Sequence, residues 1–200
     1  MNSHQVDQLL GYPWIEDEIK IFAHCDTILD VGCGTAWFAN ALADAYSNAQ
    51  LIGIDILNAV KCGQLEFILA SATNLPFTSG SFSAVSCKAV LEHLWEPLQA
   101  IREINRVLKE DGIVFISVPD ARSKGFWDDY THFRPYTKKS MEAMLIDGGF
   151  EMQSSWYLGE FPGVGILLRS MKVKNQKILR ALGKYRINRS VLNVVARKKK

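Results

Sequence analysis

The sequence predicts an α/β fold of the doubly wound, Rossmann-like kind: a mostly parallel seven-stranded sheet with an antiparallel last strand and helices on both faces. Short apolar runs alternate with stretches of helical periodicity along most of the chain. Two glycines, Gly32 and Gly34, follow the first apolar run, as in ligand-binding turns of such folds. The chain has 200 residues, 48% of them hydrophobic, which suits a single domain over residues 1–200.

The first part of the chain is expected to form a helix followed by one β-α-β unit. Pro13 suits the first turn of a helix, which we expect over residues 13–23. A buried strand is expected over residues 27–31. Apolar residues at helical spacing then predict a helix over residues 36–46, and the next apolar run predicts a strand over residues 51–54.

Strands and helices keep alternating in the rest of the chain. We expect a helix over residues 97–109, stopped by Asp111 and Gly112, and another that Thr137 caps and that runs to residue 146. Alternation of apolar and polar residues in the run 150–158 is typical of an antiparallel edge strand. The remaining strands are expected at residues 66–69, 84–87, 113–118 and 190–196.

Charge is distributed unevenly along the chain. Residues 1–160 hold all 21 acidic residues but only 11 of the 23 Lys and Arg, so they carry a net charge of −10, whereas the last forty residues carry +12. We expect a basic helical insertion at about residues 162–189, before the last strand. Its apolar and basic residues alternate as in helices that lie on anionic membranes. A solvated basic tail is the alternative, and RNA is a weaker one, because no RNA-binding module is present.

The cysteines and the N-terminus bear on redox state and location. Cys25, Cys33, Cys62 and Cys87 form no C-x-x-C pair and have no histidines at zinc-ligand spacing, so we expect reduced thiols and no metal site. The first residues lack the pattern of a signal peptide, and no apolar run is long enough to span a membrane. We expect a cytoplasmic protein, with peripheral contact at the inner membrane surface through the basic segment.

Two acidic residues end the first two expected strands. Asp30 precedes the glycine turn, where its carboxylate would repel a phosphate but could accept from a ligand ammonium. Asp55 stands where a carboxylate can bind both hydroxyls of a ribose. A nicotinamide-binding turn is the rival interpretation, but its third glycine would fall at Trp37. The pair therefore favours a nucleoside ligand with an amino-acid end.

Several motifs occur together and in order: DVGCGT at 30–35, ASATNLPF at 70–77, SFSAVSCKAVLEHL at 81–94, VLKEDGIVFISVPD at 107–120 and GGF at 148–150. With these motifs the chain resembles the class I S-adenosylmethionine (SAM)-dependent methyltransferases, in particular the methyltransferase type 11 group that includes quinone-biosynthesis enzymes. The resemblance implies SAM as cofactor. It implies cofactor contacts by Asp30, Gly32, Cys33, Gly34, Asp55, Ser71, Ala72 and Lys88. The chain departs from the family at Ser71, usually an acid, and at Ala36, usually a glycine.

The acceptor side is expected after the fourth and fifth strands. Glu92 and His93 lie on one turn after the fourth strand, and residues 125–137 after the fifth are rich in aromatic and charged side chains. His93 and His132 are the candidate catalytic bases, with no ground in the sequence for ranking them. Glu92, Tyr130 and Arg134 are candidates for substrate contact.

Together these features predict a methyltransferase that passes the methyl group of SAM, by in-line displacement, to a small-molecule, lipid-linked or saccharide acceptor. The alternative is a SAM-binding module without catalysis that acts through its basic C-terminal region.

Overall fold

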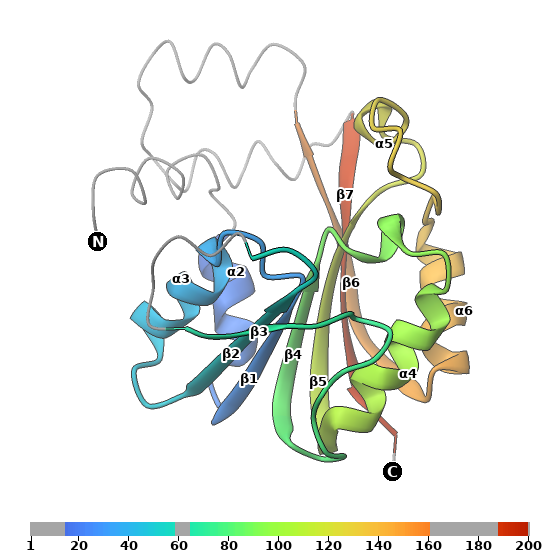
Figure 1. Ribbon diagram of the computed structural model, residues 1–200. Coiled ribbons are helices and arrows are strands. Elements are labelled where there is room, and N and C mark those ends of the chain that lie inside the picture. Colours follow the sequence, from blue (N-terminus) through green and yellow to red (C-terminus); the bar gives the residue numbers. More distant parts are fainter. Residues whose placement is uncertain (1–14, 59–64, 161–187, 200) are drawn as a thin grey trace, which may run out of the picture.

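The computed structural model describes residues 15–58, 65–160 and 188–199, and it confirms the predicted doubly wound fold (Figure 1). Seven strands form one sheet in the order β3-β2-β1-β4-β5-β7-β6. Their bounds are β1 (Thr27–Val31), β2 (Gln50–Asp55), β3 (Glu66–Leu69), β4 (Phe82–Lys88), β5 (Leu108–Pro119), β6 (Phe150–Glu160) and β7 (Asn188–Lys198). Neighbouring strands from β3 to β5 pair in parallel, whereas β7 pairs antiparallel with both β5 and β6.

The strand order reverses between β1 and β4, which are neighbours in the sheet although β2 and β3 separate them in sequence. In open sheets of this kind, ligands bind at the carboxyl ends of the strands beside such a reversal. The turns after β1, β2 and β4 are therefore the places to look for a site.

Helices cover both faces of the sheet (Figure 1). One face carries α2 (Ile15–Ile19), the short helix η1 (Lys20–Phe22) and α3 (Trp37–Ala45), and its core includes Phe22, Phe38 and Phe115. The other carries α4 (Pro97–Val107) and α6 (Lys138–Asp147), where fully buried Ile101, Ile104 and Leu145 pack on the strands. Burying apolar surface on both faces fixes the sheet and hence the turns at its edge.

Two helix boundaries follow from local sequence. Thr137 caps α6 as predicted, with its hydroxyl accepting from the Ser140 amide at 3.2 Å. The prediction that a helix runs to residue 109 and stops at Asp111 is wrong. The helix ends at Val107, because Leu108 is fully buried and pairs with Phe82 at the start of β5.

Residues 109–112 form an irregularity within β5, since Phe82 pairs with Leu108 but Ala84 pairs with Ile113. Asp111 adopts a left-handed φ of 59° in this bulge.

The structure confirms the predicted antiparallel edge strand, since β6 lies at the edge of the sheet and pairs antiparallel with β7. The expected basic helical insertion at residues 162–189 lies almost entirely outside the described residues, as does the start of the helix expected at Pro13. Within the described ranges, no helix combines the length and apolar character that crossing a membrane requires.

Candidate active site

The turn after β1 is built around left-handed backbone. Gly32 and Gly34 have φ values of 71° and 53°, and Ala36 has 63° although it carries a Cβ. A Cβ on Gly32 would lie 2.2 Å from Val90 Cγ2, so this glycine is required for packing. A Cβ on Gly34 would meet no described atom within 4 Å, so the space beside Gly34 is open to a ligand.

Asp55 ends β2 and holds this turn in place. Its Oδ2 accepts from the Gly34 amide at 2.9 Å, and its Oδ1 accepts from the Leu57 amide at 3.0 Å. A carboxylate has about four acceptor positions, so further donors can still bind. The structure thus brings the two sequence-predicted groups, the glycine turn and Asp55, into direct contact.

Asp30 lies at the end of β1 and is 3% exposed. Burial raises the pKa of this carboxyl to about 7, the Asp55 carboxylate adds to the rise, and the Lys88 ammonium opposes it. Among the described residues, Asp30 forms no ion pair within 4 Å. Asp30 therefore presents a buried carboxyl that a ligand cation could compensate.

The edge expected to contact adenine lies after β3. Ser71 is half-buried and its hydroxyl shares a hydrogen bond of 2.9 Å with Thr73, while Ala72 is buried. The side chains of Ile56 and Leu57, directly after Asp55, are 69% and 67% exposed. The sequence interpretation missed these two apolar residues. Their signal was their place after a strand-end acid, because large exposed aliphatic groups beside a polar group often mark a ligand site.

Cys33 and Lys88 point away from the turn. The Cys33 side chain is 5% exposed and packs against Gly53, and its amide donates to the Ile54 carbonyl at 2.9 Å. The Lys88 ammonium forms an ion pair with buried Glu18 of α2 and lies 4.5 Å from the centre of the Phe38 ring. The ion pair therefore holds the Lys88 side chain against the α2 and α3 face. Contacts through the backbone of either residue stay predictions.

A second cluster of polar groups lies after β4. The short helix η2 (Leu91–His93) carries Glu92 and His93, and the segment after β5 brings His132 beside them. The rings of His93 and His132 are 4.7 Å apart, and one potential ligand atom of each of the three residues lies within 4.8 Å of the others. The structure thus joins the two candidate bases into one site.

Glu92 is 0% exposed, and neither of its carboxylate oxygens has a hydrogen-bond partner within the described residues. Burial raises the pKa of this carboxyl to about 7. The backbone ties its turn to the loop: the Phe133 amide donates to the Glu92 carbonyl at 2.8 Å, and the Tyr136 hydroxyl donates to the Leu91 carbonyl at 3.1 Å.

The predicted substrate residues on the loop lie nearer the surface. Tyr130 is 94% exposed, and Arg134 donates to the Trp95 carbonyl at 3.1 Å. The Trp95 and Phe133 rings stack at 4.1 Å and both are exposed. The loop also contains α5 (Lys124–Trp127), at the end of the sheet where β5 ends (Figure 1).

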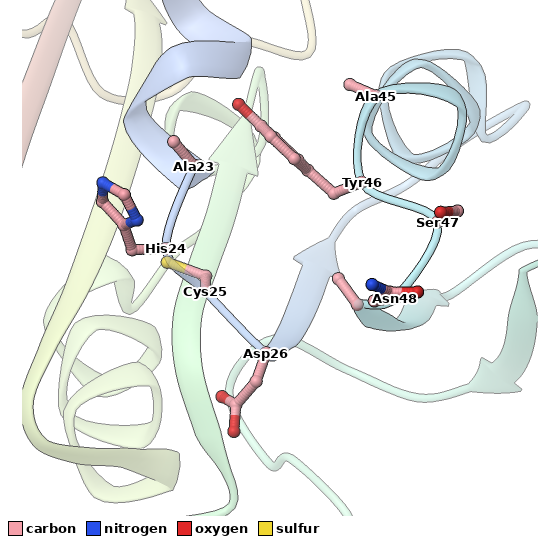
Figure 2. Close-up of a pocket in the computed structure, with 9 residues that line it drawn as sticks. Ala23, His24, Cys25, Asp26, Ala45, Tyr46, Ser47 and Asn48 are labelled. Carbon is pink, nitrogen blue, oxygen red and sulfur yellow. The ribbon is translucent and has the colours of Figure 1, made fainter.

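A surface pocket lies at the other end of the strands, away from these turns. Figure 2 shows residues that line it, namely His24, Cys25 and Asp26 on the segment before β1, and Tyr46 and Asn48, which follow α3. These residues stand at the amino ends of the strands, and the pocket contains none of the predicted site residues. Because parallel sheets bind ligands at their carboxyl ends, the chemistry is assigned to the turns after β1, β2 and β4.

Comparison with known proteins identifies relatives of this domain. A methyltransferase domain family model matches residues 29–116, which include the glycine turn, Asp55 and Glu92–His93. A ubiquinone biosynthesis O-methyltransferase of Albidiferax ferrireducens is 32% identical over 135 residues, which are 62% of this chain and 52% of that protein. One of Pseudomonas paraeruginosa is 31% identical over 127 residues, 56% of this chain and 52% of that protein.

The chain spans about half the length of these curated relatives. Among solved structures, a SAM-dependent methyltransferase from Archaeoglobus fulgidus superposes with a TM-score of 0.73 at 18% identity, and the alignment covers 96% of this chain and 94% of that one. The fold is thus that of the Rossmann-like methyltransferases.

Proposed function

We propose, since the chain belongs to the SAM-dependent methyltransferase family, that it transfers the methyl group of SAM to a hydroxyl of a small-molecule acceptor. One observation carries the proposal. An open glycine turn, a buried carboxyl at Asp30 and the ribose-type acid Asp55 lie at the reversal of strand order, and the Glu92 cluster follows the neighbouring strand β4. This arrangement supports a cofactor site and an acceptor site at one edge of the sheet.

The residues present fit SAM. The space beside Gly34 is open, and Asp55 keeps acceptor positions that suit two ribose hydroxyls. Exposed Ile56 and Leu57 offer apolar surface for the adenine ring, with Ser71 and Ala72 at its polar edge. The carboxyl of Asp30 would compensate the ammonium of the methionine part.

When bound, SAM supplies an electrophilic methyl group on a sulfonium. The acceptor oxygen forms a bond to this carbon as the carbon–sulfur bond breaks, and the hydroxyl proton leaves to a base. Holding two reactants in line supplies about 7 to 11 kcal/mol of such a barrier. We therefore propose that this chain catalyses the transfer mainly by positioning the two reactants, and that His93 or His132 accepts the hydroxyl proton.

The acceptor is proposed to have an aromatic or apolar part. Four exposed aromatic side chains lie on the chain segments that carry the two histidines, namely Trp95, Trp127, Tyr130 and Phe133. The two curated relatives carry names that describe O-methylation in ubiquinone biosynthesis, which is consistent with a ring hydroxyl as the acceptor group.

We also propose that the basic segment 162–189, as part of the same 1–200 domain, lies on anionic membrane. Membrane contact would make a lipid-linked acceptor accessible to the site. Each surface Lys or Arg contributes about 1 kcal/mol at an anionic surface. Replacing Lys172, Lys174 and Lys177 by Gln should reduce co-sedimentation with vesicles that contain phosphatidylserine. Unchanged co-sedimentation would remove the membrane proposal and leave a cytoplasmic protein with a soluble acceptor.

The decisive experiment is transfer of labelled methyl from SAM into a cell extract separated into lipid, small-molecule, RNA and protein fractions. Asp55→Ala is the control, since it removes the ribose acceptor. Label in the small-molecule or lipid fraction that is lost in the variant supports the proposal. Label in RNA or protein overturns the acceptor class, and SAM binding without label in any fraction favours a non-catalytic SAM-binding module.

A further inference from the structure

We propose that Glu92, His93 and His132 form a binding site for a divalent transition-metal cation such as Zn²⁺. The role of this cation in the reaction rests on the proposed function. Metal binding itself can be tested without SAM or acceptor. One ligand atom from each of the three residues lies within 4.8 Å of the other two. Two imidazoles and one carboxylate are a ligand set that zinc and its neighbours bind well.

Both histidines are oriented by carbonyl groups. His93 Nδ1 lies 3.2 Å from the Thr131 carbonyl oxygen, and His132 Nδ1 lies 2.8 Å from the Phe126 carbonyl oxygen. The Thr131 hydroxyl also lies 3.0 Å from His93 Nδ1 and donates to Asp129 Oδ1 at 2.6 Å. In the tautomer in which each Nδ1 donates to its carbonyl, Nε2 holds a lone pair that a metal can accept. Metal-binding histidines show this pattern, in which the second ring nitrogen donates to a carbonyl and fixes the ligand orientation.

The carboxylate supplies the independent observation that points to a cation. Glu92 is fully buried, and both of its oxygens lack a hydrogen-bond partner in the part of the chain that the structure describes. Burying an uncompensated carboxylate is unfavourable, and buried charges are normally paired or bound to metal. Asp129, whose Oδ2 lies 3.7 Å from His132 Nε2, adds negative charge at the edge of the site.

The geometry needs only a small adjustment. Ligand atoms around a tetrahedral zinc lie roughly 3.4 Å apart, given Zn–N and Zn–O distances of about 2.1 Å. Three atoms already within 4.8 Å reach this spacing by movements of about 1 to 1.5 Å, which side-chain rotation provides. Three protein ligands leave a fourth position for water or for the acceptor hydroxyl, whose pKa the cation would lower.

With the cation bound, His93 and His132 are ligands and no longer bases. The cation would then lower the pKa of the acceptor hydroxyl, and the proton of that hydroxyl would pass to water. This differs from the sequence expectation of no metal site, which rested on ligand spacing along the chain.

The test is metal binding to the full chain after removal of bound metal with a chelator. Zn²⁺ is measured by equilibrium dialysis, and Co²⁺ is used as a spectroscopic probe, because four-coordinate Co²⁺ absorbs visible light much more strongly than six-coordinate Co²⁺. We expect one equivalent of Zn²⁺, a four-coordinate Co²⁺ spectrum and a rise in melting temperature with Zn²⁺. His93→Ala, His132→Ala and Glu92→Gln should each weaken binding at least tenfold.

The control variants are His4→Ala and His24→Ala, which replace the chain's other two histidines and should leave binding unchanged. Glu92→Gln keeps the side-chain shape and removes a buried charge, so it should fold even where a histidine variant does not. Equal Zn²⁺ affinity in wild type and Glu92→Gln, or a six-coordinate Co²⁺ spectrum, would overturn the proposal. SAM affinity of Glu92→Gln, expected to match wild type, reports separately on the proposed function.

Discussion

Replacing Asp30 by Asn should stabilise the protein at pH 8 while it weakens SAM binding. The ordinary pKa of this group is 3.8, and burial raises it to about 7 in the folded chain. Above pH 7 the carboxyl is ionised in both states, and the folded state carries the full penalty of a buried charge. Below about pH 4 it is protonated in both states and the penalty is absent.

The magnitude follows from this difference. A shift of about three pH units, at about 1.4 kcal/mol per unit, makes a penalty of about 4 kcal/mol at pH 8. An asparagine side chain keeps the shape but still buries a polar amide, so the expected gain is about 2 to 3 kcal/mol. Between pH 4 and 7 the folded state binds one more proton than the unfolded state, so the stability of the wild type falls as pH rises through this window. The stability gained by Asp30→Asn therefore grows as pH rises.

The assay is urea unfolding of wild type and Asp30→Asn at several pH values from 4 to 8. Asp44→Asn, which removes an exposed carboxylate of α3, is the matched control and should change stability little at any pH. SAM affinity of Asp30→Asn should fall at least tenfold, since a charged hydrogen bond contributes about 1.5 to 3 kcal/mol. A variant that is less stable at pH 8, or a difference that is constant with pH, would refute the reasoning.

Two further predictions each test one contact, the packing of the glycine turn and the buried ion pair of Lys88. Gly32→Ala should lower the free energy of unfolding by about 2 to 3 kcal/mol more than Gly34→Ala. Both substitutions are strained by a left-handed φ, but only a Cβ at position 32 would meet Val90, at 2.2 Å. Equal losses in urea unfolding would contradict this prediction. Lys88→Met should destabilise by about 3 to 5 kcal/mol by leaving Glu18 buried without its cation, and adding Glu18→Gln should restore most of the loss. Calorimetry of the single and double variants decides the point, and no recovery in the double variant would count against a stabilising role of the pair.

Much of the fold was predictable because it depends on local patterns. Apolar runs and helical spacing gave every described strand and the positions of α3, α4 and α6, and the Thr137 cap followed from its residue type. The end of α4 was missed because burial of Leu108 and its pairing with Phe82 overrode the turn residues Asp111 and Gly112. Such tertiary pairing leaves no signal in a local window.

The site was predictable to the extent that its groups end strands. Asp30, Gly34 and Asp55 come together because the parallel strands β1 and β2 are neighbours and end at one edge. The direction of the Lys88 side chain was not predictable, because its partner Glu18 is 70 residues away on α2. The histidine pair escaped any spacing rule for the same reason, since the segments that carry His93 and His132 meet only through the fold.

The buried acidic residues fall into two groups, one with a structural role and one with a proposed functional role. Four acidic side chains are at most 3% exposed among the described residues, namely Glu18, Asp30, Glu92 and Asp120. Glu18 is paired with Lys88, and Asp120 accepts from Arg122 Nε at 2.9 Å and from Arg122 Nη2 at 3.2 Å. These two acids are compensated by cations of the protein itself and serve the fold.

Asp30 and Glu92 form no ion pair with Lys or Arg within 4 Å in the described chain, and burial raises the pKa of both to about 7, although the more distant Lys88 ammonium partly opposes the rise at Asp30. An uncompensated buried acid destabilises the folded state, so its presence in a well-packed domain points to a cation that binds there. Asp30 lies at the end of β1 and Glu92 lies on η2, which follows the adjacent strand β4, so both acids are beside the reversal of strand order. The ammonium of SAM at Asp30 and a metal ion at Glu92 would supply the two missing charges.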